Sequence, residues 1–214
     1  MGEEEPTQEE YFKNLEKQLG RDLGQCLPGN TRGTKEERHE TAVRLVDDFL
    51  ELGGSPNAVD EDDMPILTTA VHYDCLPLVK LLLDHGADVN VENSTHYAAG
   101  DLLYAFLMGT GKNMELLDII LRAGANLDGV FNHGAAKEWF GTAEEWLESP
   151  ETSINPLQGK KILERIRHER RRRVVIQKVN AFKEVTKPHA AGIPASVLRE
   201  DHVNDIVNRV MNRL

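Results

Sequence analysis

The sequence has few cysteines, few aromatic side chains and no long apolar segment. Its two cysteines, Cys26 and Cys75, form no Cys-x-x-Cys or Cys/His spacing, which argues against a disulfide framework and a structural zinc site. No run of 18 consecutive apolar residues occurs, so no membrane-spanning helix is expected. The first eleven residues, MGEEEPTQEEY, lack the apolar stretch of a secretory signal peptide. We therefore expect an intracellular protein, cytoplasmic or nuclear, or one that acts inside a host cell as a secreted effector.

Motifs that carry chemistry are also scarce. The eight histidines are scattered, and no Ser, Thr or Cys near them follows a nucleophile motif. Gly111 and Lys112 are similar to the end of a phosphate-binding loop, but Asn113 stands where Ser or Thr would hold Mg²⁺. The acidic run Asp60-Glu61-Asp62-Asp63 lacks the spacing of an EF-hand calcium loop. We therefore expect no enzyme activity, no cofactor and no metal site.

Two short apolar helical patterns and a glycine turn lie between Met64 and Glu92. In the second pattern, Leu78 to Leu83 form a nearly continuous apolar stripe, which is typical of a helix held between neighbours. Gly86 follows, where the end of a helix favours a residue that tolerates the left-handed conformation. Two helices of about eight to ten residues cannot bury these faces alone, so the pattern predicts stacked copies.

Such copies are present on both sides of this segment. The related stretches are LVDDFLELGGSPN at 45–57, LVKLLLDHGADVN at 78–90 and ELLDIILRAGANLD at 115–128. Their turn glycines, Gly53, Gly86 and Gly124, are spaced by 33 and 38 residues. A period of about 33 residues with two helices and a turn resembles the ankyrin-repeat family. The resemblance implies an all-α solenoid of paired antiparallel helices with hairpin fingers.

We divide the chain into three parts on these patterns. Residues 1–34 form an acidic N-terminal segment with a capping helix, and residues 35–170 form the ankyrin-repeat domain, with two regular units flanked by degenerate ones. Residues 171–214 form a basic helical tail. Its last segment, 196–214, is amphipathic and either folds back on the solenoid or inserts in a groove of a partner. Near the end of the repeats, Trp139, Phe140 and Trp146 are expected to seal the solenoid.

The charge is unevenly distributed along the chain. Residues 160–214 hold 14 Lys and Arg against 6 Asp and Glu, a net charge of +8. Residues 1–159 hold 11 basic and 30 acidic residues, a net charge of −19. This division suggests either a basic partner for the solenoid, contact between the two halves, or simply a soluble surface.

The resemblance implies that the finger tips and the exposed side of each first helix form a concave recognition face. Mapped onto this sequence, that face contains Glu61, Asp62, Met64, His72 and Tyr73. In the next unit, Leu107 and Met108 occupy or adjoin positions that are usually polar, so they either pack under an enlarged loop at 109–112 or form an apolar spot on a partner surface. The candidate partner-binding residues are therefore Glu61, Asp62, Met64, His72, Tyr73, Tyr97, Tyr104 and Leu107.

A basic cluster begins the last quarter of the chain, at Arg165, Arg170, Arg171, Arg172 and Arg173. Three interpretations stay open: a nuclear-localisation or nucleic-acid patch, contact with the acidic repeats, and a solvated helix face supported by neighbouring glutamates. We predict a non-enzymatic protein-interaction module, an adaptor, effector or inhibitor, that binds a basic protein partner through the concave face. The alternative is a nucleic-acid- or chromatin-associated factor that uses the arginine cluster.

Overall fold

The computed structural model describes residues 7–29, 32–60, 63–91, 102–109, 112–133, 139–150 and 152–186, together with Asp205 and Arg209. Within it, the chain divides into two compact units, Met1–Pro156 and Leu157–Leu214. The expected boundary between residues 170 and 171 falls inside a continuous helix of the second unit.

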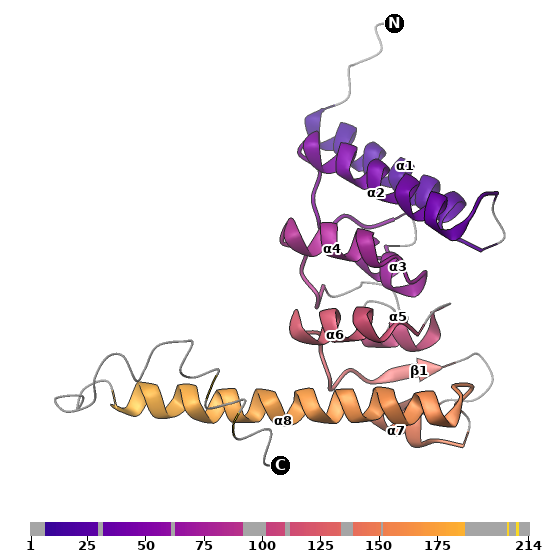
Figure 1. Cartoon of the computed structure of the whole chain (residues 1–214). Helices are drawn as coiled ribbons and strands as arrows, with labels where there is room; N and C mark the ends of the chain where they lie inside the picture. The colour runs from indigo at the N-terminus through magenta and orange to yellow at the C-terminus, as the bar shows by residue number, and fades with distance from the viewer. Residues whose placement is uncertain are drawn as a thin grey trace, which may run out of the picture. The chain divides into compact units, whose positions relative to one another are not determined.

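The first unit is a stack of antiparallel helix pairs (Figure 1). The first helices of successive pairs contact each other, as α3 and α5 do, and so do the second helices α2 and α4. This arrangement confirms the expected all-α solenoid. The helices of the unit are α1 (Gln8–Cys26), α2 (Lys35–Glu51), α3 (Ile66–His72), α4 (Leu76–Asp84), α5 (Leu102–Met108), α6 (Met114–Arg122) and α7 (Ala143–Glu148).

The first pair is more complete than the sequence patterns indicated. The sequence predicted only a capping helix within residues 1–34, whereas α1 packs along α2 and buries Leu19 and Leu23. The amphipathic stretch expected only to cap the stack therefore serves as the first helix of its first pair. Its length of 19 residues, against 7 for α3, explains why the 33-residue period did not reveal it.

Among the helix starts that the structure describes, three have a capping box. In α2, the Thr34 side chain accepts from the Glu37 amide, and the Glu37 carboxylate accepts from the Thr34 amide at 2.8 Å. Helices α1 and α7 begin in the same way with Thr7 and Thr142. Each box satisfies amides that the first helical turn leaves without partners, which fixes the start of these helices by local sequence.

Second helices end in the turn that the repeat glycines predicted. Gly53, Gly86 and Gly124 all have left-handed backbones, with φ of 91°, 82° and 102°. In the middle turn, the Ala87 amide donates to the Leu82 carbonyl and the Gly86 amide to the Leu83 carbonyl. This pair of hydrogen bonds is a Schellman motif, in which glycine avoids the steric cost of a side chain at positive φ.

Asparagine side chains join the turns of neighbouring pairs. Asn57 Oδ1 accepts from the Asp88 amide at 2.7 Å, and Asn90 Oδ1 accepts from the Asn126 amide at 2.8 Å. The Asn90 side chain also donates to the Gly124 carbonyl at 3.2 Å. Asn57 and Asn90 stand at the same place in their repeats, so the repeat period produces a ladder of hydrogen bonds along one edge of the stack.

Apolar side chains of α3 to α6 form the core of this unit. In α3, every residue from Ile66 to Val71 is buried, including Thr68 and Thr69. The stripe of α4 is also buried at Leu78, Val79 and Leu82. Leu107 and Phe106 of α5 are 2% and 1% exposed. The core thus lies between successive pairs, as the need for stacked neighbours predicted.

A short β-hairpin follows the third pair, at a place where the sequence predicted only a degenerate repeat. Strands β1 (Phe131–His133) and β2 (Trp139–Gly141) are antiparallel, with Asn132 opposite Phe140. Aromatic residues at Phe131, Trp139 and Phe140 have high strand propensity, which is the signal that the helical period obscured. Trp146 on α7 is 3% exposed, so it is buried as expected of a residue that seals the stack.

The second unit contains one long helix, α8 (Pro156–Thr186). A loop precedes it, since residues 152–155 are non-helical. Residues 161–166 and 174–185 belong to this same helix, since no proline or glycine occurs between Gly159 and Pro188. Of the amphipathic segment 196–214, only Asp205 and Arg209 lie among the described residues, and their side chains form an ion pair at 2.6 Å.

No helix in the described part of the chain is both long and apolar enough to cross a lipid bilayer.

Candidate functional site

A groove of about 450 Å³ lies on the first-helix side of the first two pairs. Three segments form it: the second half of α1, the turn before α3, and the end of α3. We call it the α1–α3 groove. Its lining residues are Gly20, Arg21, Gly24, Gln25, Asp60, Met64, Thr69, His72 and Tyr73.

Two glycines of α1 open one side of this groove. Gly20 and Gly24 are four residues apart and therefore lie on the same face of the helix. A Cβ atom added at Gly24 would meet nothing within 4 Å. Glycine inside a helix costs roughly 0.5–1 kcal/mol relative to alanine. The missing side chains therefore leave room beside α1 at a cost to its stability.

The turn before α3 forms a second side of the groove. Val59 and Pro65 form an antiparallel bridge. Next to it, the Asp60 amide donates to the Met64 carbonyl at 2.9 Å. The Asp60 carboxylate also accepts from the Met64 amide at 2.9 Å. Asp63 has a left-handed backbone with φ of 58°. These bonds hold the base of the finger that the sequence predicted, and they direct Met64 to the groove lining.

Helix α3 supplies a buried hydroxyl and two rings. Thr69 is 8% exposed, and its Oγ1 atom is buried without a hydrogen-bond partner among the described residues. Unpaired buried polar atoms are costly, so this hydroxyl is suited to bond with a group that enters the groove. His72 and Tyr73 stand edge to face, with ring centroids 4.9 Å apart. Their contact fixes both rings at the rim of the groove.

Charged side chains surround the end of α3. Lys35, the first residue of α2, forms an ion pair of 2.7 Å with the buried Asp74, whose backbone is left-handed with φ of 55°. Lys112 donates to the Gly109 carbonyl at 2.7 Å. Burial, and secondly the charge of Lys112, lowers the pKa of His72 below its ordinary value. The imidazole at the rim is therefore held in its neutral form at neutral pH.

Burial also makes the thiol of Cys75, which follows Asp74, unreactive. Cys75 is fully buried, and burial raises its pKa to about 11. Cys26 on α1 is only partly buried, and its pKa is also raised, mainly by burial. Reactive cysteines are instead exposed and have lowered pKa values, so neither thiol is a nucleophile candidate. No group of three or more potential metal ligands occurs within the described ranges.

The segment that contains the finger, α3 and α4 matches a known family. The ankyrin repeat family model matches residues 62–94. The chain contains ankyrin repeats. A protein of fowlpox virus (strain NVSL) that is named as an ankyrin repeat protein is 45% identical over 54 residues, which are 25% of this chain and 7% of that protein.

A second relative extends the match. A protein of Acanthamoeba polyphaga mimivirus, also named as an ankyrin repeat protein, is 38% identical over 94 residues, which are 41% of this chain and 54% of that protein. The match thus spans about half of one viral relative and a small part of the other. Ankyrin repeats are in general non-enzymatic protein-interaction modules, which agrees in this coarse form with the predicted class of function.

The groove brings together some of the predicted partner-binding residues. Met64, His72 and Tyr73 all line it. Tyr104 is partly buried on α5 and is not part of the groove lining. Leu107 is 2% exposed, so it belongs to the core of the ankyrin repeats and has no surface to offer a partner. Glu61, Asp62 and Tyr97 lie outside the described residues.

Sequence reasoning missed the α1 side of the groove. Gly20 and Gly24 are four residues apart within an amphipathic pattern, which is a visible sign of a missing ridge on one helix face. Thr69 was not among the predicted partner-binding residues. Its unpaired hydroxyl depends on the packing of three segments, which no local pattern reports.

The predicted basic cluster lies on α8 in the second unit. The buried carboxylate of Glu169 binds Arg172 at 3.3 Å and Arg173 at 3.1 Å. These two arginines therefore pair with a carboxylate of their own helix. Arg165 and Arg171 are exposed, and Arg170 is partly buried.

The histidine at the rim makes the stability of the repeats depend on pH. Because burial lowers the folded-state pKa of His72, its contribution is fully present above the unfolded-state pKa of about 6.5 and is lost as the pH falls through the folded-state value. We expect the melting temperature to fall between pH 7 and pH 5, and to fall less in His72→Gln. The exposed His85, changed to Gln, is the control and should leave the decrease unchanged. Equal pH dependence in all three proteins would contradict this role.

Proposed function

We propose that this chain is a protein-binding module that holds a segment of a partner protein in the α1–α3 groove. The observation that supports it is the combination, in one groove, of open space at Gly24 and an unpaired, buried hydroxyl at Thr69. A polypeptide segment carries both an N–H donor and a carbonyl acceptor on every residue except proline, so it can satisfy that hydroxyl. The His72 and Tyr73 rings at the rim provide apolar contact area for its side chains.

We further propose that the partner surface is basic. The net charge of −19 over residues 1–159 would attract a positively charged protein during encounter. Arg21 and Asp60 are both part of the groove lining, so the local lining does not select one sign of charge. The charge of the module as a whole is thus expected to raise the association rate, while the groove provides the specific contacts.

A substitution at Gly24 tests this proposal without weakening the fold. Gly24→Leu adds a good helix-forming residue to α1 and extends a side chain into the open space of the groove. We expect the helix to be retained and the affinity for groove-bound partners to fall by at least about tenfold, the equivalent of 1.4 kcal/mol. The measurement is affinity capture from cell extract with wild type and variant, followed by binding titration with each captured protein.

Asn14→Leu is the matched control, because it adds the same side chain to an exposed position of α1 about 15 Å away along the helix. Partners of the groove should bind wild type and Asn14→Leu equally and lose binding to Gly24→Leu. If Gly24→Leu retains every partner with unchanged affinity, the groove is not the binding site.

The alternative function, nucleic-acid binding by the cluster Arg165–Arg173, has less support. Arg172 and Arg173 pair with Glu169, and the chain as a whole carries a net charge of −11, which repels a polyanion. No observation on the described part of α8 indicates contacts with bases or sugars, which a nucleic-acid site would need beyond the attraction of phosphates. We therefore do not propose it as the function.

A further inference from the structure

A second groove lies on the opposite helices of the first two pairs. It has a volume of about 490 Å³ and is formed by the exposed face of α2 together with Pro77 in the first turn of α4. Glu36, Glu40, Val43 and Asp47 line it and follow one another at positions i, i+4, i+7 and i+11. In an α-helix this spacing places all four on one stripe, within about 60° of each other around the axis. We call it the acidic stripe.

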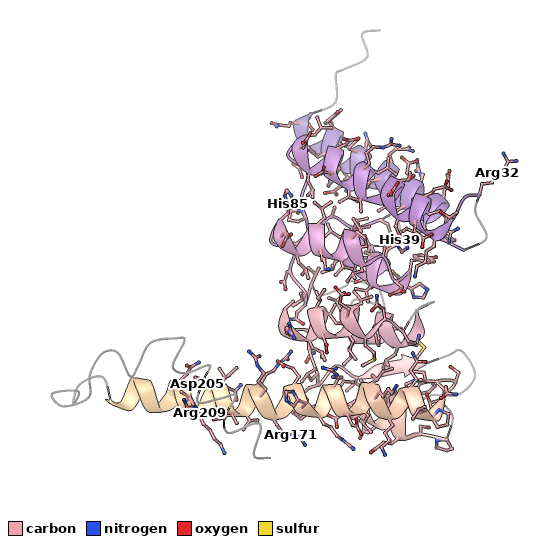
Figure 2. The ribbon with its side chains drawn as sticks, viewed as in Figure 1. Arg32, His39, His85, Arg171, Asp205 and Arg209 are labelled. Atoms are coloured by element: carbon pink, nitrogen blue, oxygen red, sulfur yellow. The ribbon has the colours of Figure 1, made fainter. Side chains whose placement is uncertain are left out.

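A stripe with the same spacing and the opposite charge lies on α8. Arg167, Arg171, Val174 and Lys178 also occupy positions i, i+4, i+7 and i+11, and all four are exposed. Val174 is 44% exposed, which makes it one of the large apolar side chains that the structure leaves in solvent. We call it the basic stripe; Figure 2 labels its member Arg171 on α8 and the neighbour of the acidic stripe, His39, on α2.

The two stripes match residue by residue. Each contains two charges of one sign, then a valine, then a third charge, so a parallel alignment pairs Glu40 with Arg171, Val43 with Val174, and Asp47 with Lys178. An antiparallel alignment would instead place Val43 opposite Arg171. Two further arginines at the centre of the helix, Arg172 and Arg173, bind Glu169 and lie off the stripe.

We propose that two copies of this chain associate through these stripes, with α8 of one copy seated in the α2 groove of the other. The matched spacing favours a second copy over an unrelated basic protein, because both complementary surfaces are present on one chain. In a dimer with twofold symmetry the contact is made twice, since each copy contributes both stripes. Val43 and Pro77 give the groove an apolar floor for Val174, and the charges around it set orientation and register.

Nearby charges do not cancel the match. Arg44 is the basic member of the groove lining; it lies beside the acidic stripe, at position i+8, and its single positive charge leaves the three carboxylates in excess. His39 also lines the groove, and its pKa is lowered, first by burial and then by the charge of Lys35. The imidazole is therefore neutral at neutral pH and does not oppose the approach of α8. The association is independent of the α1–α3 groove.

The experiment is sedimentation equilibrium of the full chain over a range of micromolar concentrations, at low and high salt. We expect a monomer–dimer equilibrium that salt weakens, because exposed charges are screened. Reversal of the acidic stripe in Glu40→Lys/Asp47→Lys should raise the dissociation constant at least about tenfold, and so should Arg171→Glu/Lys178→Glu. The variant with all four changes should dimerise again, because it exchanges the charges on both sides.

The control is Asp48→Lys/Lys161→Glu. These residues lie about 120° around their helices from the stripes, so this variant changes similar charges and should leave the dimer intact. Far-ultraviolet circular dichroism checks that every variant is folded. The proposal fails if wild type is monomeric at every concentration, or if the fourfold variant does not recover the dimer. A monomer whose melting temperature alone follows the charge reversals also overturns it, because the stripes would then pair within one chain.

Discussion

Phe106→Ala is expected to lower the free energy of unfolding of the ankyrin unit by about 3–5 kcal/mol. Phe106 is 1% exposed on α5, and this helix packs against α3, α6 and α7. Truncation of the ring removes its burial and leaves a cavity that three surrounding helices cannot fill without moving. Because natural domains are stable by only about 5–15 kcal/mol, this loss is expected to be visible as a large shift in the denaturation midpoint.

Urea denaturation followed by circular dichroism at 222 nm measures this effect. The control is Leu52→Ala, which removes an aliphatic side chain that is 59% exposed at the end of α2 and should change the stability by less than about 0.5 kcal/mol. A loss for Phe106→Ala as small as that of the control would show that α5 does not contribute a packed core.

Gly109→Ala is the second substitution with a large expected effect. A Cβ atom at this position would lie 2.4 Å from the His72 carbonyl oxygen and 2.8 Å from the Ala105 carbonyl oxygen. Both are backbone atoms, so relief of the contact requires α3 and α5 to move apart. We expect a loss of about 1–3 kcal/mol, the usual cost of an overfilled interior. We also expect weaker partner binding, because the displaced segment carries the His72 ring.

The control for Gly109→Ala is an alanine substitution at Gly24, which is expected to raise stability instead of lowering it. Gly24 has open space around its Cβ direction and lies inside α1, so Gly24→Ala should stabilise the protein by roughly 0.4–1 kcal/mol. Thermal denaturation of both variants beside wild type gives the comparison. If the two alanine variants shift the melting temperature in the same direction, the close approach of Gly109 to α3 does not control stability.

The repeat architecture was predictable from sequence because its signals are local and periodic. The stripe of α4 and the glycines at 53, 86 and 124 determine helix ends and repeat spacing, and the structure confirms these features. The length of α1 and the hairpin at 131–141 were not predicted. Both depart from the 33-residue period, so a comparison that searches for that period cannot detect them.

The candidate site was only partly predictable, for a physical reason. Met64, His72 and Tyr73 were found because the ankyrin resemblance assigns positions to the fingers and first helices. For Leu107 the sequence left packing under the loop at 109–112 and exposure to a partner both open, because helical spacing does not distinguish a core position from an exposed one when both neighbours are apolar; the side chain is buried. The space beside Gly24 and the unpaired hydroxyl of Thr69 arise only where α1, the finger and α3 meet.

The asparagine ladder also gives the stack built-in probes of its own opening. The amides of Asp88 and Asn126 are in exposed turns, where amide hydrogens ordinarily exchange rapidly with solvent, yet each is bonded to an asparagine of the preceding repeat. Each amide exchanges only when this bond opens, either because the asparagine side chain rotates away or because the two repeats separate. Their exchange rates therefore report on the contact between the first and second repeats, and between the second and third, at two individual atoms.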